Sequence, residues 1–315
     1  MRIVYLDEPT YLPGAWRRRF AELGDFEVFH DRPDRRTAVN RLNGADAAIV
    51  EWTHLDAELL AEVDRLRYLT LVTSSFDAVD LSAARERGIT VAHCPDYSCQ
   101  AVAEHTFALL LAVSRRLLPA DRAVRKGASH LYPPFLGRQL SGLTLGVLGT
   151  GRIATAVARI AAGFGMQAIG ANRTGTAVSG ITVVPLEDLL DRSDVLSLHV
   201  PLTPATRRIL TAERLAMLRP TAVLVNTCRG ALVDQSALAR MLVDGRLAGA
   251  ALDDLVDDDA EVLRGLGNVV LSPGIAWYTD TARTANLAEI HHNLTTYLAG
   301  RPANVLTAPH GQSSP

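Results

Sequence analysis

The sequence predicts an α/β protein of two domains, each built from parallel βαβ units, and three observations lead to this prediction. The chain has 315 residues, and at roughly 150 residues per domain this length favours two domains with a cleft between them. Short apolar runs of β type alternate with helical patterns along the chain, as parallel sheets require. One of these strands runs directly into a glycine turn and then into a helix.

The first series of strands and helices occupies residues 1 to about 98. Its clearest strands are expected at Ile3–Leu6, Ala47–Val50 and Leu69–Val72. Its clearest helices are expected at Ala15–Leu23 and Ala57–Val63. A long and mostly apolar helical pattern, Ala101–Arg116, follows and connects this series to the next.

The second series is longer and more regular. Its strands are expected at Thr144–Leu148, Gln167–Gly170, Val195–His199, Ala222–Asn226, Gly249–Asp253 and Asn268–Ser272. The last helical pattern, about Ala282–Ala299, stops at Gly300 and Pro302. A helix of this length can cross back to the first domain. We therefore expect residues 1–98 plus 286–315 to form one domain and residues 99–285 to form the other.

Composition and charge narrow the class of function. The formal net charge is −2 and the arginines are scattered along the chain, so we expect no binding to nucleic acid. No apolar run approaches the roughly 20 residues of a membrane span. The chain enters a strand directly after Met1, without an apolar signal segment, so we expect a cytoplasmic protein. A small molecule is the expected partner.

The three cysteines, Cys94, Cys99 and Cys228, show no CxxC spacing and no histidine at ligand spacing. This pattern predicts reduced thiols and no metal site. A catalytic cysteine is the less favoured alternative.

The glycine turn predicts a dinucleotide site. Gly149 permits the tight turn, and Gly151 lets the backbone approach a pyrophosphate. Arg152 and Ile153 follow as candidate cofactor contacts, and a helix is expected at Ala154–Ala162, whose free N–H groups and positive dipole favour a phosphate. Ala154 replaces the third glycine of the fingerprint and is small enough for close packing of helix on strand.

The end of the next strand favours NADP(H) over NAD(H). An NAD site places an acid about 20 residues after the first glycine, where it accepts from the ribose 2′-hydroxyl. This chain has Asn172, Arg173 and Thr174 there. A neutral amide does not repel a 2′-phosphate, and a guanidinium and a hydroxyl can bind it. The alternative is that Arg173 is only a solvated surface charge.

Five ordered motifs resemble those of the D-isomer-specific 2-hydroxyacid dehydrogenases, with the subgroup of glyoxylate and hydroxypyruvate reductases and C-terminal-binding proteins as the nearest pattern. They are Ala101–Thr106, Asp121–Arg125, Leu145–Ile153, Leu198–Thr203 and Val225–Gly230. The resemblance implies a Rossmann cofactor domain inserted into a flavodoxin-like substrate domain. It also implies an oxidoreductase acting on CH–OH groups and a homodimer formed through the cofactor domain.

The resemblance also assigns residues. Arg229 matches the family arginine that binds the substrate carboxylate and carbonyl, where a planar cation would grip an α-keto acid in two places. Asp253 matches the aspartate that faces the nicotinamide carboxamide. The remaining cofactor contacts that it implies are His199, Val200, Pro201, Thr227, Cys228 and Gly274.

Two catalytic positions depart from the family pattern. Where the family has a glutamate, counting on from Asp253 reaches Asp258, within an acidic run. Where the family has the histidine that protonates the carbonyl oxygen, this chain has Gly274. Loss of a positioned acid costs roughly 10²- to 10⁴-fold in rate. Activity on ordinary 2-hydroxy acids is therefore doubtful on the sequence, and Asp258 has no histidine to orient.

The expected substrate pocket is also altered. Ser74 and Ser75 lie where relatives have a glycine-rich turn that holds the substrate carboxylate, and Trp277 is a candidate wall for a bulky or apolar substrate. The loop from Glu51 to His54 lacks the arginines that bind a substrate phosphate in phosphoglycerate-oxidising relatives, which disfavours a phosphorylated substrate.

Two hypotheses of function remain open on the sequence. The first is an NAD(P)H-dependent reductase of an atypical 2-keto acid, ketone or imine. Its proton would come from Tyr278, His54, His93 or water, and an iminium substrate would need no carbonyl protonation. The second is a catalytically inactive NADP(H)-binding protein with a regulatory or partner-binding role.

Overall fold

The computed structural model describes residues 1–130, 132–256 and 260–307. Contacts divide the chain into two compact units, one of Met1–Ser98 with the chain from Thr279 on, and one of Cys99–Tyr278. The sequence placed the second boundary between residues 285 and 286, inside a helix that the structure assigns whole to the first unit. The reason is packing of the part of the helix before residue 286, because the guanidinium carbon of Arg283 lies 4.1 Å from the centre of the Tyr11 ring in the first unit.

The first unit contains a five-stranded parallel sheet of order β2-β1-β3-β4-β5, the flavodoxin-like order. The strands are β1 (Arg2–Tyr5), β2 (Asp25–Val28), β3 (Ala47–Val50), β4 (Tyr68–Leu71) and β5 (Thr90–Ala92). Each of β1, β3 and β4 lies within one or two residues of its predicted position. β2 and β5 were not predicted from the sequence.

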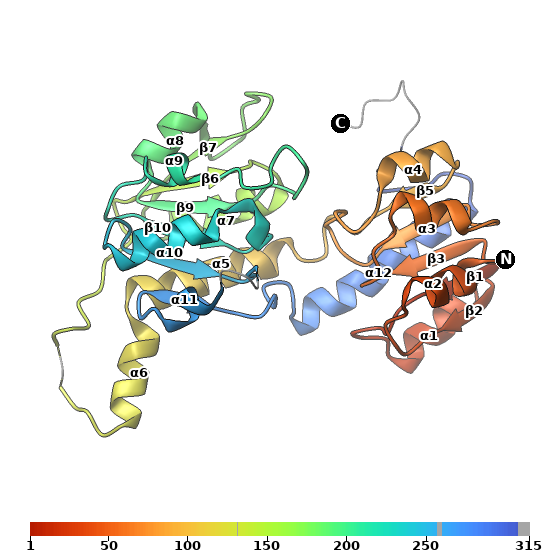
Figure 1. Ribbon diagram of the computed structural model, residues 1–315, viewed down its shortest axis with the longest axis horizontal. Helices are drawn as coiled ribbons and strands as arrows, with labels where there is room; N and C mark the ends of the chain where they lie inside the picture. The colour runs from red at the N-terminus through yellow and green to blue at the C-terminus, as the bar shows by residue number, and fades with distance from the viewer. Residues whose placement is uncertain (131, 257–259, 308–315) are drawn as a thin grey trace. The chain divides into compact units, whose positions relative to one another are not determined.

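Helices cover both faces of this sheet (Figure 1). One face packs against α1 (Gly14–Ala21) and α12 (Asp280–Leu298) through Phe20, Leu287 and Ile290. The other face packs against α2 (Arg35–Leu42), α3 (Ala57–Glu62) and α4 (Leu81–Glu86). The carboxylates of Asp34, Asp56 and Asp80 accept from backbone N–H groups at the starts of these three helices, the usual way to satisfy a helix start.

The second unit contains a seven-stranded parallel sheet of order β12-β11-β10-β9-β6-β7-β8. The strands are β6 (Thr144–Leu148), β7 (Gln167–Ala171), β8 (Thr182–Val183), β9 (Val195–Leu198), β10 (Val223–Asn226), β11 (Gly249–Leu252) and β12 (Val269–Leu271). From β6 the chain first moves outward through β7 to β8 and then returns to β9 on the other side. Ligands of such sheets bind beyond the carboxyl ends of the strands at this point of reversal.

Helices also cover both faces of the second sheet (Figure 1). One face packs against α5 (Cys99–Ser114) and α7 (Arg152–Gly163). The other packs against α8 (Leu186–Arg192), α9 (Ala212–Leu215), α10 (Gln235–Val243) and α11 (Ala260–Gly265). A short 3₁₀ helix, η1 (Gly230–Leu232), follows β10.

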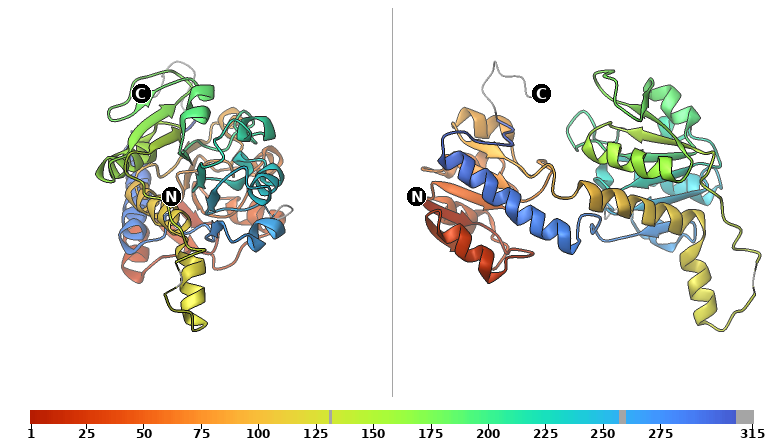
Figure 2. Two further views of the ribbon diagram at one scale, coloured as in Figure 1. Left: turned by 90° about the vertical axis from the view of Figure 1, so that its left-hand side faces the viewer. Right: turned by 180° about the vertical axis from the view of Figure 1, so that it is seen from behind.

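The helix α6 (Leu117–Arg125) has no buried residue. It projects from the rest of the second unit in both orientations of the ribbon (Figures 1 and 2). Among the described residues, no helix has both the length and the apolar character that a membrane crossing needs.

Candidate functional site

The turn after β6 requires a glycine at position 149. Gly149 has φ +92° and its N–H donates to the carbonyl of Ala171 at 2.8 Å. A Cβ added there would lie 2.3 Å from the carbonyl oxygen of His199 and 2.9 Å from a methyl group of Val200. The chain therefore passes against the end of β9 at a separation that a side chain would prevent.

Gly151 differs from Gly149, because neither its backbone conformation nor a close contact requires a glycine there. Its φ of −76° is ordinary, and a Cβ there would meet no described atom within 4 Å. It is the N-cap of α7 and offers no side chain to the free N–H groups, and the first turn carries no acid. Arg152 is exposed and Ile153 is half-buried at this end. Unsatisfied N–H groups beside open space are the chemistry that holds a diphosphate, so the turn fits a dinucleotide.

Asn172 organises the loop after β7. Its amide donates to the Thr150 hydroxyl at 2.8 Å and to the Thr176 carbonyl at 2.9 Å, and its own oxygen accepts from Thr174 at 3.3 Å. Both amide hydrogens are thus used inside the protein, and Asn172 joins the glycine turn to the next loop. The side chains of Arg173 and Thr174 are exposed beside it.

His199 is neutral at physiological pH. Burial lowers the pKa of its imidazole to about 4. Its Nε2 lies 2.9 Å from the Ser197 hydroxyl, while Nδ1 is buried without a partner in the described part of the chain. Because a buried polar atom without a partner is costly, this orphan beside the Gly149 turn is consistent with a site that gains a polar partner when a dinucleotide binds. A neutral imidazole adds no charge to the site.

The turn after β10 is held by its own amide side chain. The Asn226 amide donates to the Arg229 carbonyl at 2.9 Å and its oxygen accepts from the Cys228 N–H at 2.9 Å. The Cys228 thiol donates to the Leu198 carbonyl at 3.1 Å. The Thr227 hydroxyl lies 3.2 Å from that of Thr106. These contacts fix the backbone from which the half-buried Arg229 side chain leaves the strand end.

The thiols of Cys228 and Cys94 are poor nucleophiles. Burial raises the pKa of Cys228 to about 12 and raises that of Cys94 well above its ordinary value. At pH 8 the thiolate fraction of Cys228 falls roughly 10³-fold relative to an ordinary thiol. We expect iodoacetamide to leave both residues unmodified in the native protein and to modify both after denaturation, as measured by mass spectrometry of peptides. Rapid modification of Cys228 by iodoacetamide in the native protein would contradict this expectation and support the hypothesis of a catalytic cysteine.

Asp253 is buried at the end of β11, where the following turn wraps around its carboxylate. It accepts from the Ser272 hydroxyl and from the N–H groups of Ile275 at 3.1 Å and Ala276 at 2.8 Å. His105 Nε2 lies 3.0 Å from the Ser272 oxygen and 3.5 Å from the carboxylate. Burial acts to raise the pKa of Asp253, but these hydrogen bonds outweigh it and lower the pKa. The carboxylate therefore stays ionised and fixes the turn that carries Gly274.

Gly274 has a backbone conformation that favours glycine. Its φ is +74°, and its N–H donates to the carbonyl of Asp253 at 2.6 Å. A residue with a side chain is disfavoured in this conformation. Trp277 and Tyr278 follow, with ring centroids 5.1 Å apart in an edge arrangement. The other catalytic candidate, Asp258, lies outside the described residues.

The loop after β4 in the first unit carries the predicted substrate contacts. Ser74 and Ser75 are half-buried. The Ser75 carbonyl accepts from the Thr73 hydroxyl at 2.7 Å, and the Ser74 carbonyl lies 2.9 Å from His93 Nδ1. His93 is thus tied to the loop.

Two polar groups that hold loops of these sites in place were not identified in the sequence analysis. Asp7, fully buried at the end of β1, accepts from the N–H groups of Glu51 at 2.8 Å and Trp52 at 3.0 Å and from the Thr53 hydroxyl. The Ser272–His105 pair supports Asp253. An acid directly after a buried parallel strand was the available signal for Asp7, whereas Ser272 and His105 are 167 residues apart in sequence.

The strand ends of the second unit thus bring together the glycine turn, Asn172, His199, the Arg229 turn, Asp253 and Gly274 at one edge of the sheet. A family model described as the NAD-binding domain of D-isomer-specific 2-hydroxyacid dehydrogenases matches residues 107–276. The chain belongs to this family of oxidoreductases. Among the described residues, no group of three or more potential ligands could hold a metal ion.

Relatives match over nearly the full length. The glyoxylate reductase of Thermococcus litoralis is 38% identical over 92% of this chain and 93% of its own. The glycerate dehydrogenase of Methylorubrum extorquens is 30% identical over 98% of this chain and 99% of its own. A solved acyclic imino acid reductase, in complex with NADPH and D-Arg, is 47% identical with a TM-score of 0.95, over 97% of this chain and 100% of that one. The family and the Rossmann cofactor fold predicted from the sequence are confirmed.

Proposed function

We propose that this family member is an NADPH-dependent reductase of the C=N bond of an acyclic 2-imino acid. One observation carries the proposal: Gly274, at the position where the resemblance implies the proton-donating histidine of carbonyl-reducing relatives, is a glycine with φ +74°. The similarity to an imino acid reductase solved with NADPH and D-Arg supports the same substrate class.

The chemistry explains why an imine tolerates this glycine. Bound NADPH supplies a hydride. When a carbonyl accepts a hydride, its oxygen needs a proton, and a positioned acid contributes about 10²- to 10⁴-fold in rate. An iminium nitrogen already carries its proton, so the C=N electron pair becomes the nitrogen lone pair without an acid from the protein. Tyr278, the candidate donor on the turn, is then not required for proton transfer.

The remaining residues of the site would bind and orient the substrate and the cofactor. The half-buried Arg229 would grip the carboxylate that imino acids share with keto acids. Ser74, Ser75 and Trp277 would shape the rest of the substrate site. The glycine turn would hold the diphosphate, and Arg173 with Thr174 would bind the 2′-phosphate.

Turnover tests the proposed substrate class. Protein and NADPH are mixed with pyruvate or glyoxylate alone, and with the same keto acid in concentrated ammonia or methylamine at mildly alkaline pH, where free amine forms the imine and part of the imine is protonated to the iminium. We expect oxidation of NADPH to be about 10²-fold or more faster with the amine present. Equal rates with and without amine would reject the imine. Binding of NADPH without turnover of any carbonyl or imine would favour the catalytically inactive alternative.

Arg173 is expected to set the cofactor preference. Arg173→Ala should weaken NADPH binding by about 10- to 100-fold and leave NADH binding nearly unchanged, because a charge-assisted contact to the 2′-phosphate is lost. Calorimetric titration of both cofactors measures this. Arg192→Ala, an exposed arginine in the last turn of α8, is the matched control. An equal loss for both cofactors would reject the assignment.

The family also implies a homodimer, and α6 supports self-association in solution. Leu117 is 58% exposed and Val124 66% exposed on this helix, and Leu136, further along, is 87% exposed. Exposed apolar side chains gathered on one projecting element mark an interface. Light scattering of the wild type and of Leu117→Glu/Val124→Glu tests it, with a dimer expected for the first and a monomer for the second.

A further inference from the structure

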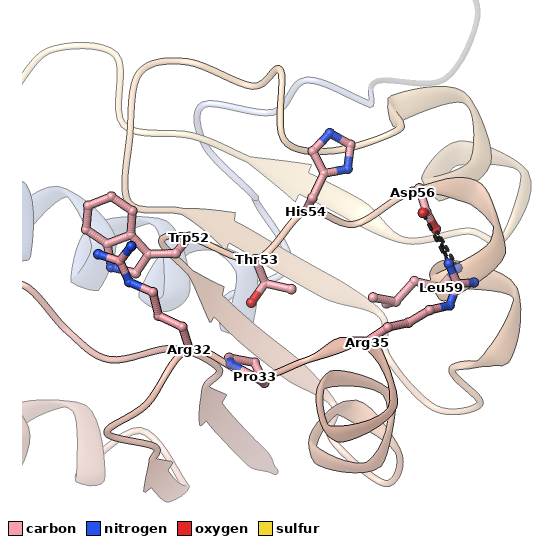
Figure 3. Close-up of a pocket in the computed structure, with 8 residues that line it drawn as sticks. All are labelled: Arg32, Pro33, Arg35, Trp52, Thr53, His54, Asp56 and Leu59. Atoms are coloured by element: carbon pink, nitrogen blue, oxygen red, sulfur yellow. Dashed lines mark hydrogen bonds and ion pairs between the residues drawn. The ribbon is translucent and has the colours of Figure 1, made fainter. Parts of the chain in front are cut away.

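The first unit contains a cavity of about 360 Å³, near the lower end of the range for small-ligand sites. Figure 3 shows its lining, with Arg32 and Trp52 at one end, Arg35 and Asp56 at the other, and His54 between them. None of these residues belongs to the dinucleotide site, which lies in the other unit.

The strand order explains why this space is open. β1 lies between β2 and β3 in the sheet, and its loop leads to α1 on one face. The loops after β2 and β3 lead to α2 and α3 on the opposite face. On that face, therefore, the end of β1 is flanked by the loops after β2 and β3, and the helix that follows β1 lies on the other face. Crevices of this kind beside a reversal of strand order are the usual ligand sites of open α/β sheets.

The two arginines of the cavity differ in their partners. Arg35 makes ion pairs with Asp56, Glu58 and Glu62, each at 3.2 Å. Arg32 forms no hydrogen bond or ion pair within the described ranges. Its guanidinium carbon lies 4.1 Å from the centre of the Trp52 ring, so the aromatic face holds the cation flat while its N–H edge stays open. The positive charge of Arg32, at one end of the cavity, is therefore not balanced by an ion pair with any described residue.

The wall beside Arg32 is rigid and polar. The backbone of the Trp52–Thr53 segment is held by the buried Asp7, which accepts from the Trp52 N–H at 3.0 Å and from the Thr53 hydroxyl. The Trp52 indole N–H donates to the Glu8 carbonyl at 3.1 Å, which fixes the ring beneath the guanidinium. The His54 ring makes no hydrogen bond in the described structure and adds a second nitrogen-bearing group to the same wall.

We propose that this cavity is a binding site for a small oxyanion, a carboxylate or a phosphate, which Arg32 grips through its N–H edge while His54 donates a further hydrogen bond. A planar guanidinium held flat matches the two oxygens of either group. The site is separate from the dinucleotide site, and its occupation would act on the Glu51–His54 loop.

Calorimetric titration of the full chain with inorganic phosphate and, separately, with succinate tests the site. Both titrations are done with saturating NADPH, so that the dinucleotide site is filled and cannot take up the probe. We expect saturable binding of one or both probes, weakened about tenfold or more in Arg32→Gln. Trp52→Leu, which removes the platform but keeps the charge, should weaken binding by less.

Arg85→Gln is the matched control, because Arg85 is exposed on α4 of the same unit and lies outside the cavity. It removes the same charge and should bind both probes as the wild type does. Binding of phosphate alone identifies a phosphoryl ligand, and binding of succinate alone identifies a carboxylate ligand. The proposal is overturned if neither probe binds, or if Arg32→Gln and Arg85→Gln behave alike. These titrations measure binding alone, so their outcome does not depend on whether the protein reduces imines.

Discussion

Replacement of Gly149 by alanine is expected to lower the free energy of unfolding by about 2 to 5 kcal/mol, even without cofactor. Overpacking a fixed contact costs about 1 to 3 kcal/mol, and the added methyl would lie 2.3 Å from the carbonyl oxygen of His199. A positive φ costs a further 1 to 2 kcal/mol or so for a residue with a Cβ, and Gly149 has φ +92°. Urea unfolding of the cofactor-free protein measures the loss.

Gly151→Ala is the matched control, and it should separate folding from binding. Its Cβ meets nothing within 4 Å in the described structure, and its φ of −76° suits alanine, so the free energy of unfolding should change by less than about 1 kcal/mol. The methyl would instead lie where a diphosphate approaches the backbone, and NADPH binding should weaken about 10-fold or more. Equal destabilisation by the two substitutions, or unchanged NADPH binding in Gly151→Ala, would contradict the proposed roles of the two glycines.

The elements that position the dinucleotide site were predictable because their signals are local. The β6–turn–α7 segment carries its own pattern, an apolar strand, two glycines and a run of alanines, and the structure places it within two residues of the prediction. Strand β2 was missed because two of its four residues are acids and only one is buried. Strands β5 and β8 were missed because they have only three and two residues. Segments so short pair with a neighbouring strand without showing a recognisable period of their own.

The side-chain partners were less predictable because they depend on tertiary contacts. The sequence proposed Asn172 as a cofactor contact from its place after β7, and it gave no sign that Thr150 and Thr176 would take both amide hydrogens. For Gly274, the sequence indicated a glycine where the resemblance implies a histidine, but it did not indicate the positive φ. A backbone conformation set by the hydrogen bonds around Asp253 cannot be read from the residues of the turn alone.

That positive φ leads to the second prediction, on Gly274→His. The substitution introduces the histidine that the resemblance implies for carbonyl-reducing relatives, but we expect it to leave glyoxylate and pyruvate reduction within about tenfold of the wild type, far below the 10²- to 10⁴-fold that a positioned acid provides. The imidazole would start from a backbone with φ +74°, where a Cβ costs about 1 to 2 kcal/mol. Relief of that strain would disturb the N–H bond from residue 274 to the Asp253 carbonyl.

Gly274→Asn separates the effect of the backbone from that of the acid, because asparagine visits the left-handed region through local hydrogen bonds of its short side chain and carries no acid. If the backbone dominates, Gly274→Asn should retain more imine reduction and a higher unfolding temperature than Gly274→His, and neither should gain keto acid reduction. A gain of 10²-fold or more in glyoxylate reduction by Gly274→His alone would mean that the turn accepts the acid and that only the side chain was lost. The glycine would then no longer argue for an imine, because a dehydrogenase that had lost one side chain would explain it equally well.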